Sequence, residues 1–167
     1  DCVISDITLD CLYETPIALH NAGLDKAVCK ALKLGGRLQL SDWKAFVKRA
    51  KNVKKEVKIA LVGKYVALHD AYLSVAEALR SGGYAVNVKV DITWVDSETV
   101  TDNTAKKIFG DADGIIIPGG FGGRATEGMI ATCKYAREND VPCLGICLGM
   151  QMMVIEYARN VCGLNGA

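Results

Sequence analysis

The sequence predicts an α/β fold in which helices cover both faces of a parallel β-sheet. From residue 57 onward, short apolar runs alternate with amphipathic segments of helical period. Half of the 167 residues are hydrophobic, which is enough to bury the core of one ordinary domain. Strands that alternate with helices require right-handed crossovers, and these produce a parallel sheet with both faces covered.

Four segments are expected to form the strands. Residues 57–62 form an apolar run that ends at Gly63, as a buried parallel strand does. Residues 86–95 alternate apolar and polar side chains, as a half-buried strand does. The isoleucines of residues 114–117 predict a central strand, and residues 142–146 predict the strand that follows it.

Helices are expected between and after these strands. Asp70 is predicted to cap a helix whose apolar side chains share one face, and Gly82-Gly83 are predicted to end it. The remaining helices are expected over residues 101–109, 126–139 and 148–159.

The N-terminal part has a different organisation. Residues 1–40 contain a helix predicted from Asp25 to Leu34, and Ser41 is predicted as the N-cap of a second helix. Residues 41–56 include many lysines and no strand pattern, so they are expected to form a solvated linker. The α/β domain is then expected to occupy residues 57–167.

Composition argues against several classes of protein. The net charge of +1 gives no general attraction to nucleic acid or to an anionic membrane. No apolar run approaches the roughly 20 residues that a membrane-spanning helix needs. The seven cysteines lack CxxC and Cys/His ligand spacing, so no metal site is expected. Most of them are expected to be reduced and to pack as small hydrophobic residues, as in a cytoplasmic protein.

A nucleophile turn is predicted where the last strand meets the last helix. The residues Gly145-Ile146-Cys147-Leu148-Gly149 match the pattern Gly-x-Cys-x-Gly between a strand and a helix. A Cβ atom at either glycine is expected to crowd its neighbours. The positive end of the helix dipole stabilises a thiolate at Cys147. The pattern alone fits a buried structural cysteine equally well, and its strand–turn–helix position favours the nucleophile.

A glycine-rich loop follows the preceding strand. Residues 118–123 read Pro-Gly-Gly-Phe-Gly-Gly, and their backbone amides are free to approach a ligand. Such amides can form an oxyanion hole or an anion nest. The string is neither a Walker A loop nor GxGxxG, so a dedicated phosphate loop is not indicated. Its position one αβ unit before the nucleophile turn favours the oxyanion hole.

These two motifs resemble those of class I glutamine amidotransferases, which have a flavodoxin-like fold. Residues 145–151, Gly-Ile-Cys-Leu-Gly-Met-Gln, resemble the nucleophile segment, and residues 118–122 resemble the oxyanion strand. Residues 63–79, beginning Gly-Lys-Tyr-Val, narrow the resemblance to the CTP synthase family, as do residues 127–130, Glu-Gly-Met-Ile. Residues 1–40 then resemble the end of the family's synthetase domain.

The resemblance implies an activity for the whole enzyme. CTP synthases aminate UTP to CTP with ATP and Mg²⁺, use ammonia released from glutamine, respond to GTP as an activator and form cytoplasmic homotetramers. No nucleic acid or membrane partner is implied. Binding sites for ATP and Mg²⁺ are expected outside this chain. No metal site is therefore expected among these residues.

The resemblance also implies roles for individual residues. Cys147 is the expected thiol nucleophile, and the amides of Gly120 and Leu148 are expected to bind the oxyanion. Gly149, Met150 and Gln151 are expected to line the glutamine pocket. The His and Glu that complete the family's triad are expected beyond residue 167, so the fold is expected to be truncated. Two departures from the family are Ala125, where glycine is usual, and Ile7-Thr8, where a basic–acidic pair is usual.

Three alternatives remain open at this point. The chain could belong to another class I glutaminase, such as one feeding GMP or carbamoyl phosphate synthesis. A cysteine hydrolase or chaperone of related fold is a second alternative, although these often carry His where this chain has Leu148. A non-catalytic binding module is the third.

Overall fold

The computed structural model describes residues 3–5, 7–36 and 39–167. The chain forms two compact units, Asp1–Lys54 and Lys55–Ala167. The boundary between these units lies inside residues 41–56, the segment predicted as a linker. Residues 1–2, 6 and 37–38 of the predicted first segment lie outside the described residues.

Short helices make up the first unit. They are the 3-10 helix η1 (Leu12–Glu14), α1 (Thr15–Asn21), α2 (Leu24–Ala31) and α3 (Ser41–Lys51). Aromatic packing joins α3 to η1, because the Phe46 ring lies 5.1 Å from that of Tyr13 in an edge-to-face arrangement. The indole Nε1 of Trp43 also donates to the Tyr13 carbonyl at 2.8 Å.

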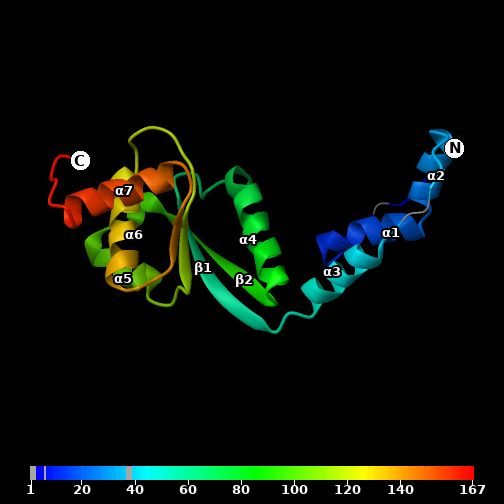
Figure 1. Ribbon diagram of the computed structural model, residues 1–167, viewed down its shortest axis with the longest axis horizontal. Helices are drawn as coiled ribbons and strands as arrows, with labels where there is room; N and C mark the ends of the chain where they lie inside the picture. The colour runs from blue at the N-terminus through cyan, green and yellow to red at the C-terminus, as the bar shows by residue number, and fades with distance from the viewer. Residues whose placement is uncertain (1–2, 6, 37–38) are drawn as a thin grey trace. The chain divides into compact units, whose positions relative to one another are not determined.

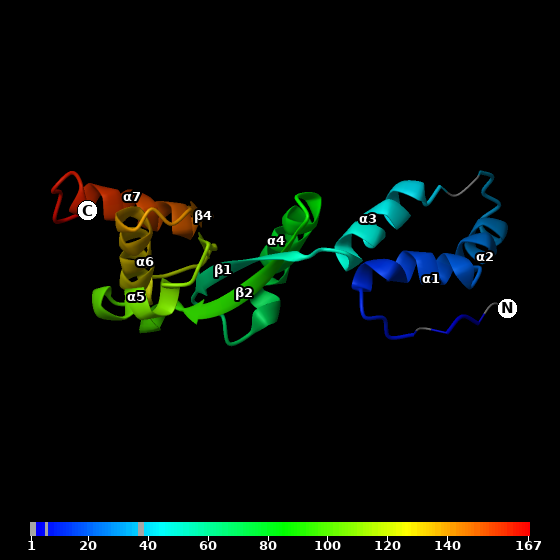
Figure 2. The ribbon, with the colours of Figure 1, turned by 90° about the horizontal axis from the view of Figure 1, so that it is seen from below.

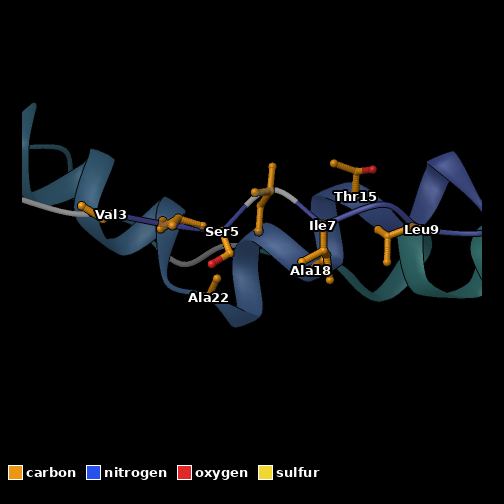
Figure 3. Close-up of a pocket in the computed structure, with 9 residues that line it drawn as sticks. Val3, Ser5, Ile7, Leu9, Thr15, Ala18 and Ala22 are labelled. Atoms are coloured by element: carbon orange, nitrogen blue, oxygen red, sulfur yellow. The ribbon is translucent and has the colours of Figure 1, made fainter.

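The first unit has little buried surface. Val47 is the one buried residue among its described residues. A cavity of about 360 Å³ lies between the extended N-terminal residues and α1, and its lining includes Ile7, Leu9, Ala18 and Ala22 (Figure 3).

Two predictions for this unit need correction. The helix predicted from Asp25 to Leu34 ends earlier, at Ala31. Leu40 is the N-cap of α3, so the capping role predicted for Ser41 is wrong. Ser41 is instead the first helical residue, and its hydroxyl donates to Asp42 Oδ1 at 3.4 Å.

The second unit contains a parallel sheet of four strands, which confirms the predicted fold class (Figure 1). The strands run in the order β2-β1-β3-β4. They are β1 (Lys55–Gly63), β2 (Val88–Asp96), β3 (Gly114–Ile117) and β4 (Cys143–Gly145). In the register of the central pair Ala60 lies opposite Ile115, and at the edge Ile116 lies opposite Leu144.

Helices cover both faces of this sheet, as predicted. The 3-10 helix η2 (His69–Tyr72) leads into α4 (Leu73–Ala85), which packs on one face (Figures 1 and 2). The opposite face is covered by α5 (Asp102–Phe109), α6 (Thr126–Glu138) and α7 (Leu148–Asn160). The short 3-10 helix η3 (Ser97–Thr99) connects β2 to α5.

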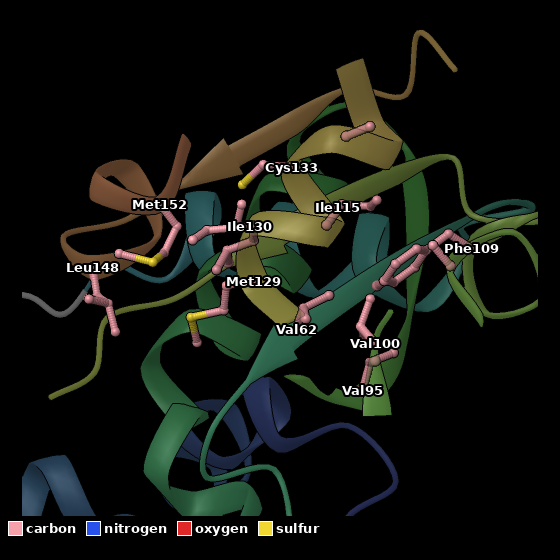
Figure 4. Close-up of a cluster of buried hydrophobic side chains, with 14 residues drawn as sticks. Val62, Val95, Val100, Phe109, Ile115, Met129, Ile130, Cys133, Leu148 and Met152 are labelled. Atoms are coloured by element: carbon pink, nitrogen blue, oxygen red, sulfur yellow. The ribbon is translucent and has the colours of Figure 1, made fainter. Parts of the chain in front are cut away.

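Successive side chains of the strands enter two different cores. Ala60 and Val62 of β1 belong to the larger core, together with Phe109, Met129 and Met152 of the three helices (Figure 4). Leu61 points the other way and packs with Tyr72 and Ile116 beneath α4. This alternation explains why the second half of β1, residues 59–62, reads as a continuous apolar run, since both faces of the strand are buried there.

The face beneath α4 is only partly covered. A groove of about 530 Å³ runs between α4 and the edge strand, and Leu144 and Ile146 line it with exposed side chains. No helix among the described residues is long and apolar enough to cross a membrane.

The predicted ends of α4 are both wrong. Tyr72, not Asp70, is its N-cap, because Asp70 lies within η2. Gly82 and Gly83 lie inside the helix, which continues to Ala85. A helical glycine costs about 1 kcal/mol relative to alanine, and close packing requires glycine at Gly83. A Cβ at Gly83 would lie 2.7 Å from the Val88 carbonyl oxygen, so only glycine allows this approach.

The other predicted elements of this unit agree with the structure to within about two residues at each end, the usual uncertainty of boundaries. Thr101 caps α5 through a capping box with Thr104, which explains why this short segment is helical.

Ala125 has a left-handed conformation at the start of α6. Its φ is 60° and its ψ is 10°, and it is the N-cap residue of the helix. A left-handed conformation costs a non-glycine residue about 1–2 kcal/mol. The departure from the family noted at this position therefore has a local energetic consequence.

We expect Ala125→Gly to stabilise the second unit by about 0.5–1 kcal/mol. Glycine removes the left-handed strain of the folded state, and the greater conformational entropy that it gives the unfolded chain cancels only part of this gain. Urea unfolding of the chain measures the change. Ala131→Gly within α6 is the matched control, and it should destabilise by about 1 kcal/mol because its backbone is helical. If both variants changed the free energy of unfolding in the same direction, the explanation would be contradicted.

Gly128 allows α6 to approach η3 closely. A Cβ atom at Gly128 would lie 1.7 Å from the Ser97 carbonyl oxygen, which is a backbone atom. We expect Gly128→Ala to destabilise the chain by about 1–3 kcal/mol, as overpacking does. Gly82→Ala is the control, since nothing lies within 4 Å of its Cβ position. It should stabilise α4 by up to about 1 kcal/mol in the same urea titration. A Gly128→Ala protein as stable to urea as wild type would contradict the packing argument.

Candidate active site

The carboxyl ends of all four strands lie along one edge of the sheet, because the strands are parallel. Binding sites in open α/β sheets form at this edge. The nucleophile turn follows β4 there, and the glycine-rich loop of residues 118–123 follows β3, its neighbour in the sheet.

Cys147 occupies a strained turn between β4 and α7. Its φ is 53° and its ψ is −105°, an unusual conformation for a residue with a side chain. Surrounding backbone hydrogen bonds hold this turn. Ile146 N–H donates to the Ile117 carbonyl at 2.9 Å, and Gln151 N–H donates to the Cys147 carbonyl at 3.1 Å. The Cys147 side chain is therefore presented, exposed, at the N-terminus of α7.

The two glycines of the turn are required by close packing, as predicted. A Cβ at Gly145 would lie 2.5 Å from the carbonyl carbon of Gly149 and from the amide nitrogen of Met150. A Cβ at Gly149 would lie 2.0 Å from the Ile117 carbonyl oxygen. Real Cβ atoms do not approach backbone this closely, so α7 can start beside β3 only if both positions lack a side chain.

The structure brings the glycine-rich loop against the nucleophile turn. The Cβ position of Gly119 lies 3.6 Å from Cys147 Cβ, and that of Gly120 lies 3.3 Å from Leu148 Cδ2. The first amides of a helix have no acceptor within the helix, and Leu148 is the first residue of α7. The Leu148 side chain thus lies beside Gly120, so the two residues predicted to donate to the oxyanion are neighbours in the fold.

The other predicted site residues are arranged differently. Met150 is 49% exposed and Gln151 is also exposed, so both can face a ligand. Gly149 is buried against Ile117. Its contribution in the structure is close packing of α7 on β3.

A lysine that the sequence reasoning did not single out lies beside this loop. Lys64 directly follows β1 and is 4% exposed. Its ammonium donates to the carbonyl of Phe121 at 3.1 Å and to that of Gly122. The available signal was a charged residue directly after the apolar end of β1.

Arg124 joins the far end of the loop to the same strand end. Its guanidinium donates to the Lys64 carbonyl at 2.9 Å and pairs with Glu98 at 2.5 Å. The hydrogen bond with the Glu98 carboxylate raises the pKa of Arg124 above its usual value, so the cation is maintained. The guanidinium also lies 5.9 Å from the centre of the Tyr65 ring.

Neither histidine is a hydrogen-bond partner of the nucleophile. His69 stacks on Trp94 with ring centres 4.2 Å apart, and His20 in the first unit contacts Asp25 at 3.0 Å. In the part of the chain that the structure describes, no side chain forms a hydrogen bond with the Cys147 thiol. The described residues therefore bring the predicted nucleophile and the predicted oxyanion donors together, with no histidine hydrogen-bonded to Cys147.

The other cysteines only partly follow the expectation that they pack as small hydrophobic residues. Cys133 is buried in the larger core and contacts Cys143, and this contact together with burial raises the pKa of the Cys133 thiol. Cys29 and Cys162 are exposed instead. All cysteines in the described segments are free thiols, and these segments contain no cluster of three or more potential metal ligands.

Comparisons with known proteins agree with this geometry. The family described as glutamine amidotransferase class-I matches residues 67–166. The CTP synthase of Lactococcus lactis subsp. cremoris MG1363 is 54% identical over 168 residues, covering 100% of this chain and 31% of that protein. That of Clostridium acetobutylicum ATCC 824 is 53% identical over the same coverage. The chain thus spans about a third of the length of these curated relatives.

A solved structure is also similar. It is the glutaminase domain of Trypanosoma brucei CTPS with bound acivicin, at 44% identity and a TM-score of 0.59. The similarity covers 64% of this chain and 42% of that one. The family match covers most of the second unit, including the turn at Cys147 and the loop before it. The chain therefore belongs to the class I glutamine amidotransferase family.

Proposed function

We propose that this chain is the nucleophile-bearing part of the glutaminase of a CTP synthase. One observation carries the proposal. The family match begins at residue 67, whereas the similarity to CTP synthases extends over the whole chain, including residues 1–66. A glutaminase that serves another synthetase would share the second unit but has no reason to share the first. A cysteine hydrolase of related fold is disfavoured on the same ground.

The proposed chemistry begins at Cys147. Its thiolate attacks the side-chain amide carbon of glutamine, and the negative charge that develops on the amide oxygen is bound by the Gly120 and Leu148 amides. Collapse of this intermediate expels ammonia and leaves a glutamyl thioester. Water then hydrolyses the thioester to glutamate and restores the thiol.

Proton transfer in these steps needs a general acid–base, which contributes about 10²–10⁴-fold in rate. We assign it to a His supported by a Glu, at positions that the family places after residue 167. Met150 and Gln151 are exposed beside Cys147 and form part of the proposed glutamine pocket.

The remaining parts of the proposal concern the whole enzyme. Ammonia from this site aminates UTP, and ATP with Mg²⁺ activates the UTP at sites outside this chain. GTP acts as the activator, and the enzyme works as a homotetramer in the cytoplasm. Similarity to CTP synthases over the full chain supports each of these assignments.

We expect Cys147→Ser in the full-length protein to abolish CTP formation from glutamine and to preserve CTP formation from ammonia. The serine hydroxyl is a far weaker nucleophile at neutral pH, whereas added ammonia bypasses the glutaminase. CTP formation from UTP and ATP is measured with each nitrogen source. Cys162→Ser is the matched control, because Cys162 is an exposed cysteine just beyond α7.

Two outcomes would contradict the proposal. A wild-type protein that makes no CTP from either nitrogen source is not a CTP synthase. A Cys147→Ser protein that still uses glutamine at the wild-type rate would remove Cys147 from the nucleophile's role.

A further inference from the structure

Lys64 carries a buried charge that is not neutralised by a carboxylate. The residue is 4% exposed, and no carboxylate of the described residues lies within ion-pair distance of its ammonium. Burying an ammonium is costly unless it is well hydrogen-bonded. An apolar residue at the end of β1 would avoid this cost, so the ammonium is expected to have a specific function.

The partners of the ammonium are two consecutive carbonyls of the glycine-rich loop. Lys64 Nζ donates to the Phe121 oxygen at 3.1 Å and also to the Gly122 oxygen. The aliphatic part of the same side chain lies against Gly120, whose Cβ position is 3.5 Å from Lys64 Cδ and 3.7 Å from Cε. One side chain therefore contacts three successive residues, beginning with the predicted oxyanion donor.

The backbone of Lys64 is itself held on both sides. Its N–H donates to the hydroxyl of the buried Tyr72 at 3.1 Å, and its carbonyl accepts from Arg124 at 2.9 Å. Lys64 is thus anchored to η2 and to the end of the sheet. Arg124 lies just after the loop, so the loop is tied to Lys64 at both its middle and its end.

A loop of this composition needs such a support. Glycine populates both positive and negative φ readily, so residues 118–123 have little conformational preference of their own. An oxyanion donor has to lie within hydrogen-bond distance of the developing charge, and a displacement of about 1 Å can reduce the rate about 10²-fold. The Cβ position of Gly120 also lies 3.3 Å from Leu148 Cδ2, so the Lys64 and Leu148 side chains together limit this residue.

We propose that Lys64 is a positioning residue that fixes the Gly120 amide for oxyanion binding. The inference rests on the proposed glutaminase reaction, and Lys64 acts through the loop without contacting the substrate. Removal of the ammonium leaves two loop carbonyls without their donor and lets the loop relax. The thiol of Cys147, held by β4 and α7, is unaffected.

The test compares Lys64→Met with Lys58→Met in the full-length protein. Met keeps the apolar stem and removes the ammonium. Lys58 lies on the same strand, but its side chain is exposed and pairs with Asp111, so it is a matched control. Four quantities are measured: glutamate release from glutamine, CTP formation from ammonia, alkylation of Cys147 by iodoacetamide, and stability to urea.

Alkylation by iodoacetamide distinguishes an effect on the loop from an effect on the Cys147 thiol. Alkylation displaces iodide at a saturated carbon, so no oxyanion forms and the rate reports only the reactivity and access of the thiol. We expect Lys64→Met to lower the kcat for glutamate release by about 10–100-fold. Alkylation of Cys147, followed by mass spectrometry of its peptide, and CTP formation from ammonia should stay within about twofold of wild type. Lys58→Met should match wild type in every assay, and Lys64→Arg, which keeps a cationic donor, should recover part of the lost rate.

The inference is overturned by unchanged glutamate release in Lys64→Met. It is also overturned if alkylation or ammonia-dependent CTP formation falls in parallel with glutamate release, because that result indicates general damage to the fold. Where Lys64→Met does not fold, Lys64→Leu, which likewise lacks a donor to the loop carbonyls, decides by the same criteria. Failure of wild type to make CTP from ammonia would instead refute the proposed function, while glutamate release would still test Lys64.

Discussion

The hydrogen bond from Ile146 N–H to the Ile117 carbonyl joins the ends of β4 and β3, and the arrangement of the site depends on it. This bond continues the parallel register past the last paired strand residues, Ile117 and Gly145. It brings the turn at Cys147 beside the loop that starts at Pro118. Because α7 begins immediately afterwards, Gly149 has to pack on the same Ile117 carbonyl, where no side chain fits.

The site accumulates several local energetic costs that the surrounding sheet offsets. Cys147 has a positive φ, a conformation that costs of order 1–3 kcal/mol for a residue with a side chain. Lys64 is buried with only carbonyl partners, and Ala125 adopts a left-handed conformation at the start of α6. The two cores on opposite faces of β1 hold the strand ends in place, and so they maintain geometry that the local sequence does not favour.

Local patterns predicted the sheet well because its strands are buried on one or both faces. The period-two alternation of β2 and the isoleucines of β3 reflect that burial directly. Helix ends were less predictable, as α4 shows. Asp70 and Gly82-Gly83 have the residue types of helix ends, but contacts distant in sequence decide the outcome. Tyr72 accepts backbone hydrogen bonds from Lys64 and Tyr65, and Gly83 packs on Val88.

The sequence by itself determined the parallel α/β class, the turn that presents Cys147 and the need for glycine at residues 145 and 149, because these features follow from short-range periodicity and sterics. Only the tertiary structure showed that the Leu148 side chain lies beside Gly120 and that the Lys64 ammonium donates to the Phe121 carbonyl. The residues in these contacts are 28 and 57 positions apart. Such contacts arise from strand order and register, which no local pattern encodes.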